Sequence, residues 1–204
     1  MVAELRAGTV ASWFDTRILA ILQSTRTPAT VFLTGLWART YPDVVRKLAS
    51  DPRIDLANHT FDHSAFEGLC YGLPIVAGGD AAKRSEVEQA AQAIQQIDGI
   101  APRWFRFPGG CSSASDVGLV QSLGETPVQW DVVSGDAFQP DPSVVIRDVL
   151  SRVRPGSIVA MHFIGAPNAP ATATALLTII PTLRARGFSF VTLDTLLRSG
   201  LLPG

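Results

Sequence analysis

Residues 140–162, with the sequence PDPSVVIRDVLSRVRPGSIVAMH, contain the pattern that decides the fold. The part Pro142–Val153 is typical of a helix, and the turn residues Pro155 and Gly156 end it. The part Ser157–Met161 is a short apolar run, which is typical of a buried strand. A helix followed by such a strand is the repeating unit of α/β proteins with parallel strands.

The same alternation extends over most of the chain. Further helices are expected at Phe14–Leu22, Tyr41–Ala49, Ala81–Ile97, Ser115–Leu123, Thr172–Arg186 and from Asp194, and further strands at Ala29–Leu33, Ile54–Ala57, Trp104–Phe107, Val128–Trp130 and Phe188–Thr192. Only Glu67–Gly79 forms an irregular insert, and no linker or internal repeat interrupts the pattern. The sequence therefore predicts one α/β domain over residues 1–204, either a barrel or a doubly wound sheet.

Composition and charge exclude several classes of protein. Because 17 Lys+Arg stand against 18 Asp+Glu, we expect no nucleic-acid partner and no anionic membrane surface. With 47% hydrophobic and 17% charged residues, the chain is typical of a globular protein. No run of about 18 apolar residues predicts a membrane span. The start MVAELRAGTVASW also lacks the apolar core of a secretory signal, so we expect a cytosolic protein or an incomplete N-terminus.

Several side chains that can do chemistry lie at or just beyond the carboxyl ends of predicted strands. They are His59, Arg106, Asp136 and His162. In (β/α) barrels this rim is where catalytic side chains converge, so their placement favours a barrel over an open sheet.

Two of the chain's three histidines stand close together in the stretch HTFDH, residues 59–63. A spacing of four would put both imidazoles on one face of a helical turn, where they could bind one divalent cation. Each histidine could equally be a satisfied core or surface residue. The pair alone is therefore a hypothesis for a metal site.

Two further stretches give the pair a context. RWFRFPGG, residues 103–110, places Arg106 at a strand end before a Pro-Gly-Gly turn, and WDVVSGD, residues 130–136, places carboxylates after another strand. From Phe14 to Leu197 the sequence resembles the polysaccharide deacetylases of the NodB-homology type, carbohydrate esterase family 4. This resemblance implies a distorted (β/α) barrel and hydrolysis of N-acetyl groups on a glycan.

The resemblance also implies roles for individual residues. His59 and His63 match the family's metal ligands for a divalent cation such as Zn²⁺, and Arg106 with Pro108 matches its arginine motif. Gly109 stands where a backbone N–H would face the oxyanion. His162 matches the catalytic acid, and Asp136, with Asp131 as the alternative, matches the aspartate that tunes it. Trp130 is a candidate sugar platform, although it, like Trp104, could simply belong to the core; Trp13 and Trp37 are expected to serve packing.

The first motif of the family, a strand ending in threonine-phenylalanine-aspartate-aspartate, is missing. Aligning by length places Phe14-Asp15-Thr16 at the entry to the first helix and leaves residues 1–12 as a truncated or foreign start, without the first strand. A second alignment sets residues 10–16 on the strand itself and makes Asp15 the catalytic base. We favour the first alignment. Asp62 is expected to be a solvated carboxylate or part of a helical turn; with the motif missing, a third metal ligand is the alternative.

Three functions remain open at this point. The first is a metal-dependent glycan deacetylase; the second is a deacetylase-like domain that binds metal and sugar without turnover; the third is an amidase of small non-sugar substrates. The family is usually exported, so an extracellular or cell-envelope location is expected, although no signal peptide is visible in this chain. Cys70 and Cys111 should then lie on the same rim, either bridged or as two free thiols. The acetylated sugar and the oligomeric state are left open.

Overall fold

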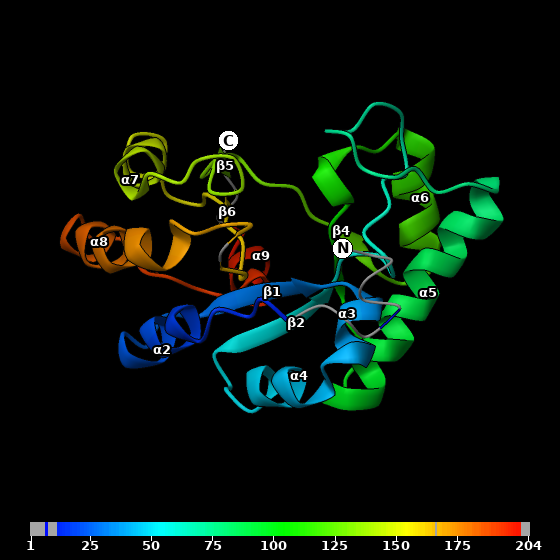
Figure 1. The fold of residues 1–204 in the computed structure, drawn as a ribbon, viewed down its shortest axis with the longest axis horizontal. Helices are drawn as coiled ribbons and strands as arrows, with labels where there is room; N and C mark the ends of the chain where they lie inside the picture. The colour runs from blue at the N-terminus through cyan, green and yellow to red at the C-terminus, as the bar shows by residue number, and fades with distance from the viewer. Residues whose placement is uncertain (1–6, 8–11, 166, 201–204) are drawn as a thin grey trace. The chain divides into compact units, whose positions relative to one another are not determined.

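The structure is a computed structural model that describes residues 7, 12–165 and 167–200, and it confirms the α/β class (Figure 1). The start predicted to be truncated or foreign, residues 1–12, lies outside the described residues except for Ala7 and Ser12. Among the described helices, none combines the length and the apolar character that crossing a membrane requires.

Helices and strands alternate along the chain, as the pattern predicts. The helices are α2 (Thr16–Ser24), α3 (Gly35–Thr40), α4 (Pro42–Ala49), α5 (Gly79–Asp98), α6 (Ala114–Ser122), α7 (Pro142–Leu150), α8 (Thr172–Ala185) and α9 (Leu193–Arg198), with a 3-10 turn at Pro108–Gly110. The strands are β1 (Ala29–Leu33), β2 (Ile54–Asn58), β3 (Trp104–Phe105), β4 (Thr126–Pro127), β5 (Val132–Val133) and β6 (Val159–Ala160).

The strands form two sheets within the described residues. One has the order β1-β2-β3-β4, in which β2, β3 and β4 pair in parallel, and the other is the parallel pair β5-β6. Parallel pairing with helical crossovers confirms the fold class. Closure into a barrel stays a prediction.

The chain divides into two compact units. The first contains Val31–Pro52 and Leu56–Gln129 together with Ser12, and the second contains Trp13–Thr30, Arg53–Asp55 and the chain from Trp130 onward. The single domain over residues 1–204 stays a prediction. Each unit has its own apolar core.

In the first unit, α5 packs against α3, α4 and α6, and α5 and α6 lie side by side in Figure 1. Gly35 permits the close approach of α3, because a Cβ at this position would come 2.6 Å from Cα of Ala90 on α5. The core of this unit is a cluster of large apolar side chains: Phe66, Val87, Phe105, Phe107 and Val120.

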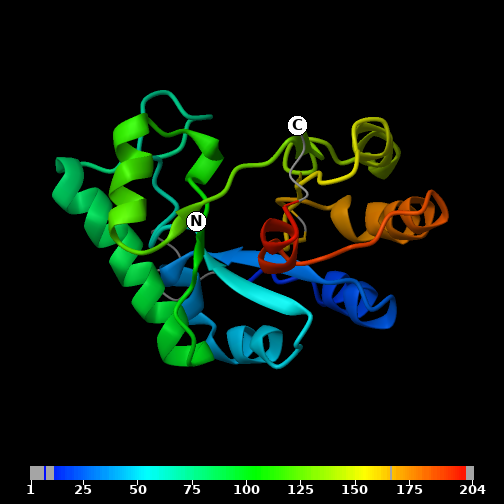
Figure 2. The same ribbon diagram turned by 180° about the vertical axis from the view of Figure 1, so that it is seen from behind.

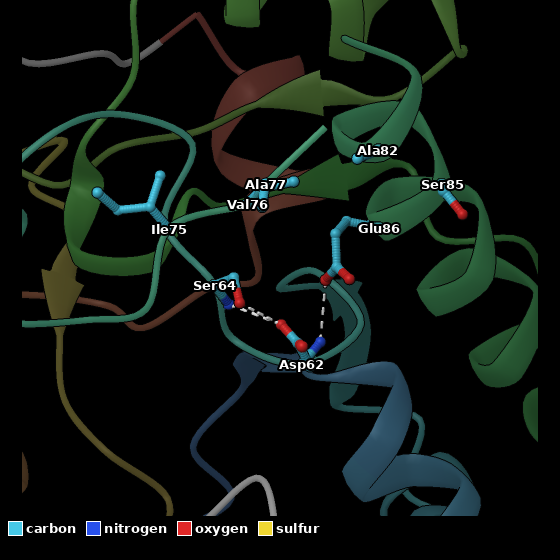
Figure 3. A pocket seen from close by; sticks show the side chains of 8 residues that line it. All are labelled: Asp62, Ser64, Ile75, Val76, Ala77, Ala82, Ser85 and Glu86. Atoms are coloured by element: carbon cyan, nitrogen blue, oxygen red, sulfur yellow. Dashed lines mark hydrogen bonds between the residues drawn. The ribbon is translucent and has the colours of Figure 1, made fainter. Parts of the chain in front are cut away.

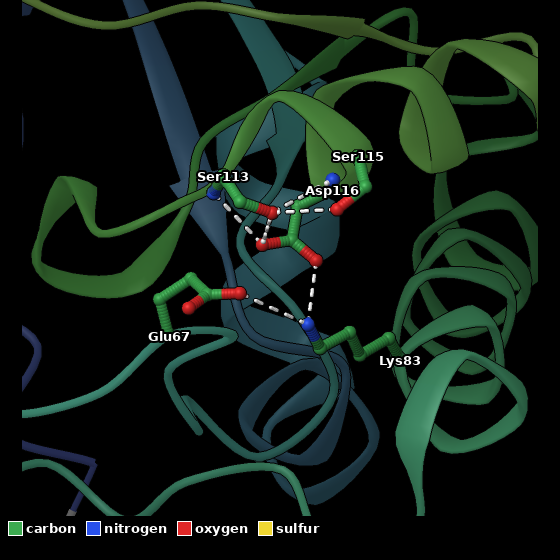
Figure 4. A network of polar contacts seen from close by, with 5 residues as sticks. All are labelled: Glu67, Lys83, Ser113, Ser115 and Asp116. Atoms are coloured by element: carbon green, nitrogen blue, oxygen red, sulfur yellow. Dashed lines mark hydrogen bonds and ion pairs between the residues drawn. The ribbon is translucent and has the colours of Figure 1, made fainter.

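A polar network connects α5, α6 and the irregular insert (Figure 4). Lys83 Nζ of α5 lies 2.6 Å from Oδ1 of Asp116 on α6 and 3.4 Å from Oε1 of Glu67 in the insert. The other oxygen of Asp116 accepts hydrogen bonds from the backbone N–H and the hydroxyl of Ser113, which closes a capping box on α6. The pair of Lys83 with the buried Asp116 joins α5 to α6, and removing one partner of a buried ion pair costs about 3–5 kcal/mol. The contact with Glu67, whose side chain is half-exposed, adds a weaker link to the insert.

In the second unit, α8 packs against α7 and α2, as Figure 2 shows from behind. Two apolar clusters fill the unit; one joins α7 to α8 and the other joins α2 to α8. Asp15 begins α2 as its N-cap, and Asp141 begins α7 in the same way.

Several predicted boundaries were wrong. No strand forms at Phe188–Thr192: Phe188 and Phe190 pack against the apolar clusters, but their segment joins neither described sheet. The strand predicted at Val128–Trp130 is replaced by β4 before it and β5 after it. The helix α3 was not predicted, because its six residues are too few for a helical period to be recognised. The insert Glu67–Gly79 is irregular up to the start of α5, as predicted.

Candidate functional site

The predicted site residues are distributed over both units. The first unit holds His59, His63, Arg106, Pro108 and Gly109. The second unit holds Asp15, Trp130, Asp136 and His162. Apart from Asp15, which precedes α2, these residues lie at a strand end or in the loop after a strand.

The histidine pair lies directly after β2. The N–H of His59 continues the strand's pairing by donating to the carbonyl oxygen of Leu33, at 2.9 Å. Nδ1 of His59 lies 2.7 Å from the carbonyl oxygen of Arg106, so this nitrogen carries the proton and Nε2 keeps a lone pair. The centroids of the His59 and His63 rings are 4.9 Å apart. The prediction that the two rings come together is confirmed.

The helical turn predicted for the pair is wrong. Residues 59–63 form a loop, in which Thr60 (φ 67°) and His63 (φ 68°) both adopt left-handed backbone conformations. Such conformations are strained for residues other than glycine and persist only where surrounding contacts hold them. A loop rather than a helix therefore brings the imidazoles together.

Apart from Thr60, which belongs to the matched histidine motif, the contacts that hold this loop come from residues that the sequence analysis missed. Oε2 of Glu86 on α5 accepts the N–H groups of Phe61 and Asp62, at 2.9 and 3.0 Å. Oδ1 of Asn58 accepts the N–H of Thr60 at 3.0 Å, and the hydroxyl of Thr60 accepts the N–H of His63 at 3.1 Å. These bonds fix the backbone on both sides of Phe61 and so orient the two imidazoles.

Asn58 is itself held by a buried carboxyl group. Its amide nitrogen donates to Oε1 of Glu125 at 2.9 Å and to the carbonyl oxygen of Val87 at 3.0 Å. Burial raises the pKa of Glu125 to about 8, although the hydrogen bond from Asn58 acts in the opposite direction. No pattern in the sequence marks Asn58, Glu86 or Glu125, because each acts through a tertiary contact between distant elements.

The two imidazoles fit part of the ligand set of a divalent cation. They are neutral nitrogen donors of the kind that zinc prefers, and the tautomer of His59 is already the one that metal binding requires. Within the described residues, no group of three or more His, Cys, Asp or Glu side chains is arranged to hold a metal ion. The chain's described contribution is therefore the pair alone.

Asp62 does not extend the pair. Its Oδ1 accepts hydrogen bonds from the N–H of Ser64 at 3.0 Å and from the hydroxyl of Ser64 at 2.5 Å. Asp62 and Glu86 line a cavity of about 280 Å³ together with residues of the insert and α5. Figure 3 shows the two carboxyl groups next to each other. The carboxylate of Asp62 thus closes an Asx-type turn.

Arg106 lies at the end of β3 and contacts the chain just after β4. Its Nε donates to the carbonyl oxygen of Val128 at 3.2 Å, and its Cζ lies 4.1 Å from the centroid of the Phe32 ring. Burial lowers the pKa of Arg106 to about 10, so it stays charged at neutral pH. Its carbonyl oxygen is the one that fixes His59, so the arginine motif contacts the histidine pair directly.

A disulfide bond links the residue directly after the Pro-Gly-Gly turn to the irregular insert. Cys70 and Cys111 are bonded, with 6.0 Å between their Cα atoms, so of the two states left open for the thiols the bridge is the one found. Gly109 has a φ of 62°, and a Cβ there would lie 2.3 Å from Sγ of Cys70. Only glycine fits this position, because any side chain would meet the bridge.

In the second unit, His162 and Asp136 form a hydrogen-bonded pair beyond β6. Nδ1 of His162 lies 2.7 Å from Oδ1 of Asp136, whose Oδ2 accepts the N–H of His162 and the hydroxyl of Thr172, both at 2.7 Å. Asp136 is 2% exposed, whereas the side chain of His162 is 51% exposed. The imidazole of His162 is therefore held in place by a buried carboxylate, while half of its own surface is open to solvent.

The two pKa values respond to this contact in opposite directions. Burial alone would raise the pKa of Asp136, but the hydrogen bonds and charge of His162 outweigh burial and hold it below its usual value. The hydrogen bond to Asp136 raises the pKa of His162 against the opposing effect of burial. The pair thus favours a protonated imidazole with Nε2–H directed away from the carboxylate.

Asp15 lies at the entry to the first helix, where the favoured alignment places it. Its carboxylate accepts the N–H of Arg17 at 2.9 Å and forms an ion pair with the guanidinium of Arg17 at 2.6 Å. The preceding Phe14 forms an isolated antiparallel bridge with Ile164 rather than a parallel strand. Hydrogen bonds from Arg17 hold the pKa of Asp15 below its ordinary value, although burial opposes them.

The remaining candidates have structural contacts. Asp131 accepts the hydroxyl of Ser157 at 2.7 Å and the N–H of Ile158 at 2.6 Å, so it caps the turn before β6, and Asp136 is the partner of His162. Trp104 is buried in the core, and Trp130 is half-buried just before β5. Trp37 donates its indole N–H to the carbonyl oxygen of Ser12.

Comparison with known proteins places this geometry in a family. The family model described as polysaccharide deacetylase matches residues 8–128. A chitooligosaccharide deacetylase of Azorhizobium caulinodans is 30% identical over 84% of this chain and 82% of its own length. YlxY of Bacillus subtilis, an uncharacterized protein, is 28% identical over 89% of this chain, which spans 52% of the length of YlxY.

A solved structure has the same fold. It is a carbohydrate esterase family 4 pseudoenzyme from Bacillus anthracis, with a TM-score of 0.80 and 24% sequence identity, and the match covers 92% of this chain and 62% of that one. Because the family model covers more than half of the chain, it shows the relationship that the motifs indicated. The chain belongs to the polysaccharide deacetylase family, the NodB-homology type of carbohydrate esterase.

Proposed function

We propose that this protein hydrolyses N-acetyl groups on a glycan in a reaction that depends on a divalent cation, most simply Zn²⁺. The observation that carries the proposal is the bond between Nδ1 of His59 and the carbonyl oxygen of Arg106, beside the ring of His63. Metal-binding histidines typically donate a hydrogen bond from their second ring N–H in this way, which sets the tautomer and the ring orientation.

In the proposed reaction His59 and His63 hold the cation. A bound zinc ion would polarise the acetyl carbonyl and lower the pKa of the attacking water. The chain's own contribution is to orient both imidazoles, through the carbonyl oxygen of Arg106 for His59 and through the hydroxyl of Thr60 for the backbone of His63.

Two further groups serve the tetrahedral intermediate and its collapse. The N–H of Gly109 is proposed to donate to the oxyanion, and Pro108 with the disulfide keeps this turn fixed. His162, whose pKa is raised by Asp136, is proposed to donate a proton to the amine leaving group.

The proposed reaction lacks a free carboxylate that could serve as the general base among the residues assigned so far. The carboxylate of Asp15 is engaged by Arg17 and by the first turn of α2, so we propose that it does not activate the water. General-base assistance is worth about 10²–10⁴ in rate. The chain should therefore turn over slowly.

A second candidate is a domain that binds metal and glycan without turnover. The same engagement of Asp15 supports it, and so does the similarity of the fold to a protein described as a pseudoenzyme. The two candidates differ only in whether acetate is released.

The disulfide bond supports an extracellular or cell-envelope location for either candidate function. Bonds of this kind persist in oxidising compartments and are rare in the cytosol. We therefore propose that the Cys70–Cys111 bridge reflects action at the cell envelope or outside the cell.

Zinc binding and acetate release, measured on the same samples, test the proposal. The wild-type chain should bind zinc by calorimetry and release acetate slowly from a chitooligosaccharide. His63→Ala should lose both, while His162→Ala should keep the zinc and lose the acetate. Equal zinc content in the wild type and His63→Ala would exclude the metal site. Zinc and glycan binding without acetate would leave the second candidate.

A further inference from the structure

The turn Cys70–Leu73, within the irregular insert, has an unusual backbone. The N–H of Leu73 donates to the carbonyl oxygen of Cys70 at 2.9 Å, and the two central residues, Tyr71 and Gly72, have φ values of 50° and 72°. Turns with two left-handed central residues favour asparagine and glycine. An aromatic residue at the first of these positions is strained, which calls for a reason outside local geometry.

The turn is held at both ends. Cys70 is buried and bonded to Cys111, which comes directly after the Pro-Gly-Gly turn, and Ala65 and Ile75 form a bridge at the base of the insert. Tyr71 is therefore fixed against the arginine-motif loop rather than carried on a long free segment.

The ring of Tyr71 lies beside Gly109 and remains open to solvent. A Cβ built on Gly109 would come 3.2 Å from Cδ2 of Tyr71, so the ring borders the backbone that carries the proposed oxyanion donor. Tyr71 is nevertheless 76% exposed. A rigid aromatic ring with an open face and a polar tip is a binding surface for a ligand that is apolar on one side and hydroxylated at its edge.

We propose that Tyr71 stacks on a pyranose ring of the glycan chain and thereby contributes to the choice of substrate. This inference rests on the proposed function, because Gly109 locates the reacting acetyl group next to Tyr71. A pyranose presents C–H groups on one face and hydroxyls at its rim, which matches an open aromatic face. A contact with sugar would explain why a tyrosine occupies this turn position, although asparagine or glycine would fit its left-handed backbone better.

The key variant is Tyr71→Asn, since asparagine tolerates the left-handed conformation. It should unfold at the same or a higher temperature than the wild type and yet bind chitotetraose more weakly, by about 2- to 12-fold, the range given by 0.5–1.5 kcal/mol per aromatic contact. Tyr71→Phe should bind within about twofold of the wild type. Leu69→Ala, in the same insert and fully exposed, is the matched control and should not change binding.

Binding is measured by calorimetry on the zinc-loaded protein, so that the result does not depend on turnover. Unchanged affinity in Tyr71→Asn, while the wild type binds chitotetraose, would overturn the stacking role and leave the proposed function intact. An equal loss of chitotetraose affinity in Leu69→Ala would also overturn the stacking role, because the sugar would then bind to any apolar surface of the insert. No binding by the wild type would overturn the proposed function together with this inference.

Discussion

His59 and His162 illustrate how one side-chain type is prepared for opposite tasks. The hydrogen-bond partner of His59 is a backbone carbonyl, which is uncharged and fixes the tautomer of the neutral ring. The partner of His162 is a buried carboxylate, which favours the imidazolium. A metal ligand must be neutral and an acid must carry a proton, so the two neighbours match the two proposed roles.

The contact between His162 and Asp136 predicts a measurable titration. Asp136→Asn should bring the pKa of His162 back down, because the neutral amide no longer favours the imidazolium. The chain has three histidines, so their ring signals can be followed individually by NMR. Asp131→Asn is the control and should leave His162 unchanged; an unchanged pKa in Asp136→Asn would show that the pair does not set the protonation state.

The Asp136–His162 pair should stabilise the folded state most strongly within a limited range of pH. His162 has a folded pKa above its ordinary value of 6.5, so its contribution is full below that value and is lost as the pH rises through the raised folded pKa. Asp136 has a folded pKa below its ordinary 3.8, so its contribution is full above that value and is lost as the pH falls through the lowered pKa. Urea unfolding should show the largest destabilisation by Asp136→Asn between these ordinary values, and a difference that peaks at alkaline pH would contradict the assignment.

Glu86 predicts a change in metal affinity without direct metal contact. Glu86→Ala removes the acceptor for two loop N–H groups and should weaken zinc binding about 10- to 100-fold, as expected for residues that orient metal ligands. Glu86→Gln retains one acceptor oxygen and should restore most of the affinity. Glu88→Ala, on the exposed side of the same helix, is the control. If Gln and Ala weaken binding equally, the charge of Glu86 rather than its hydrogen bonds is what matters.

Among the elements, the irregular insert is the one that depends on a covalent bond. The bridge closes a loop with a sequence separation of 41 residues, so replacing both cysteines by alanine should lower the free energy of unfolding by about 2–4 kcal/mol. Urea denaturation with and without a reductant measures this. The reductant should destabilise the wild type and leave the double variant unchanged; no effect on the wild type would show that the bridge is not formed in solution.

The sequence predicted the bounds of long helices more accurately than those of short strands. The helices α5 and α8 extend over several turns and were predicted nearly to their ends, because apolar residues recur often enough to reveal the period. The strands β4, β5 and β6 have two residues each, too few for any period, and only tertiary pairing defines them. Residues such as Glu86 and Asn58 were missed for a related reason, since their partners come from other elements.

At the scale of the whole molecule, the chain has the fold of the family and side chains that match several of its motifs, and Asp15 begins a helix. The histidine pair, the arginine motif and the Asp136–His162 pair are present, while Asp15 caps α2 and pairs with Arg17. The motif order could be predicted from the sequence, because each motif is local. The sequence alone allows two alignments for Asp15, because its position depends on the contacts of Phe14 with Ile164 and Phe163.

The rate of acetate release from a chitooligosaccharide by the zinc-loaded wild type, Asp15→Asn and His162→Ala tests the central claim most directly. We expect slow release by the wild type, the same rate for folded Asp15→Asn, and loss of the rate in His162→Ala at unchanged zinc content. Loss of most of the rate in folded Asp15→Asn would show instead that Asp15 is the base that activates water.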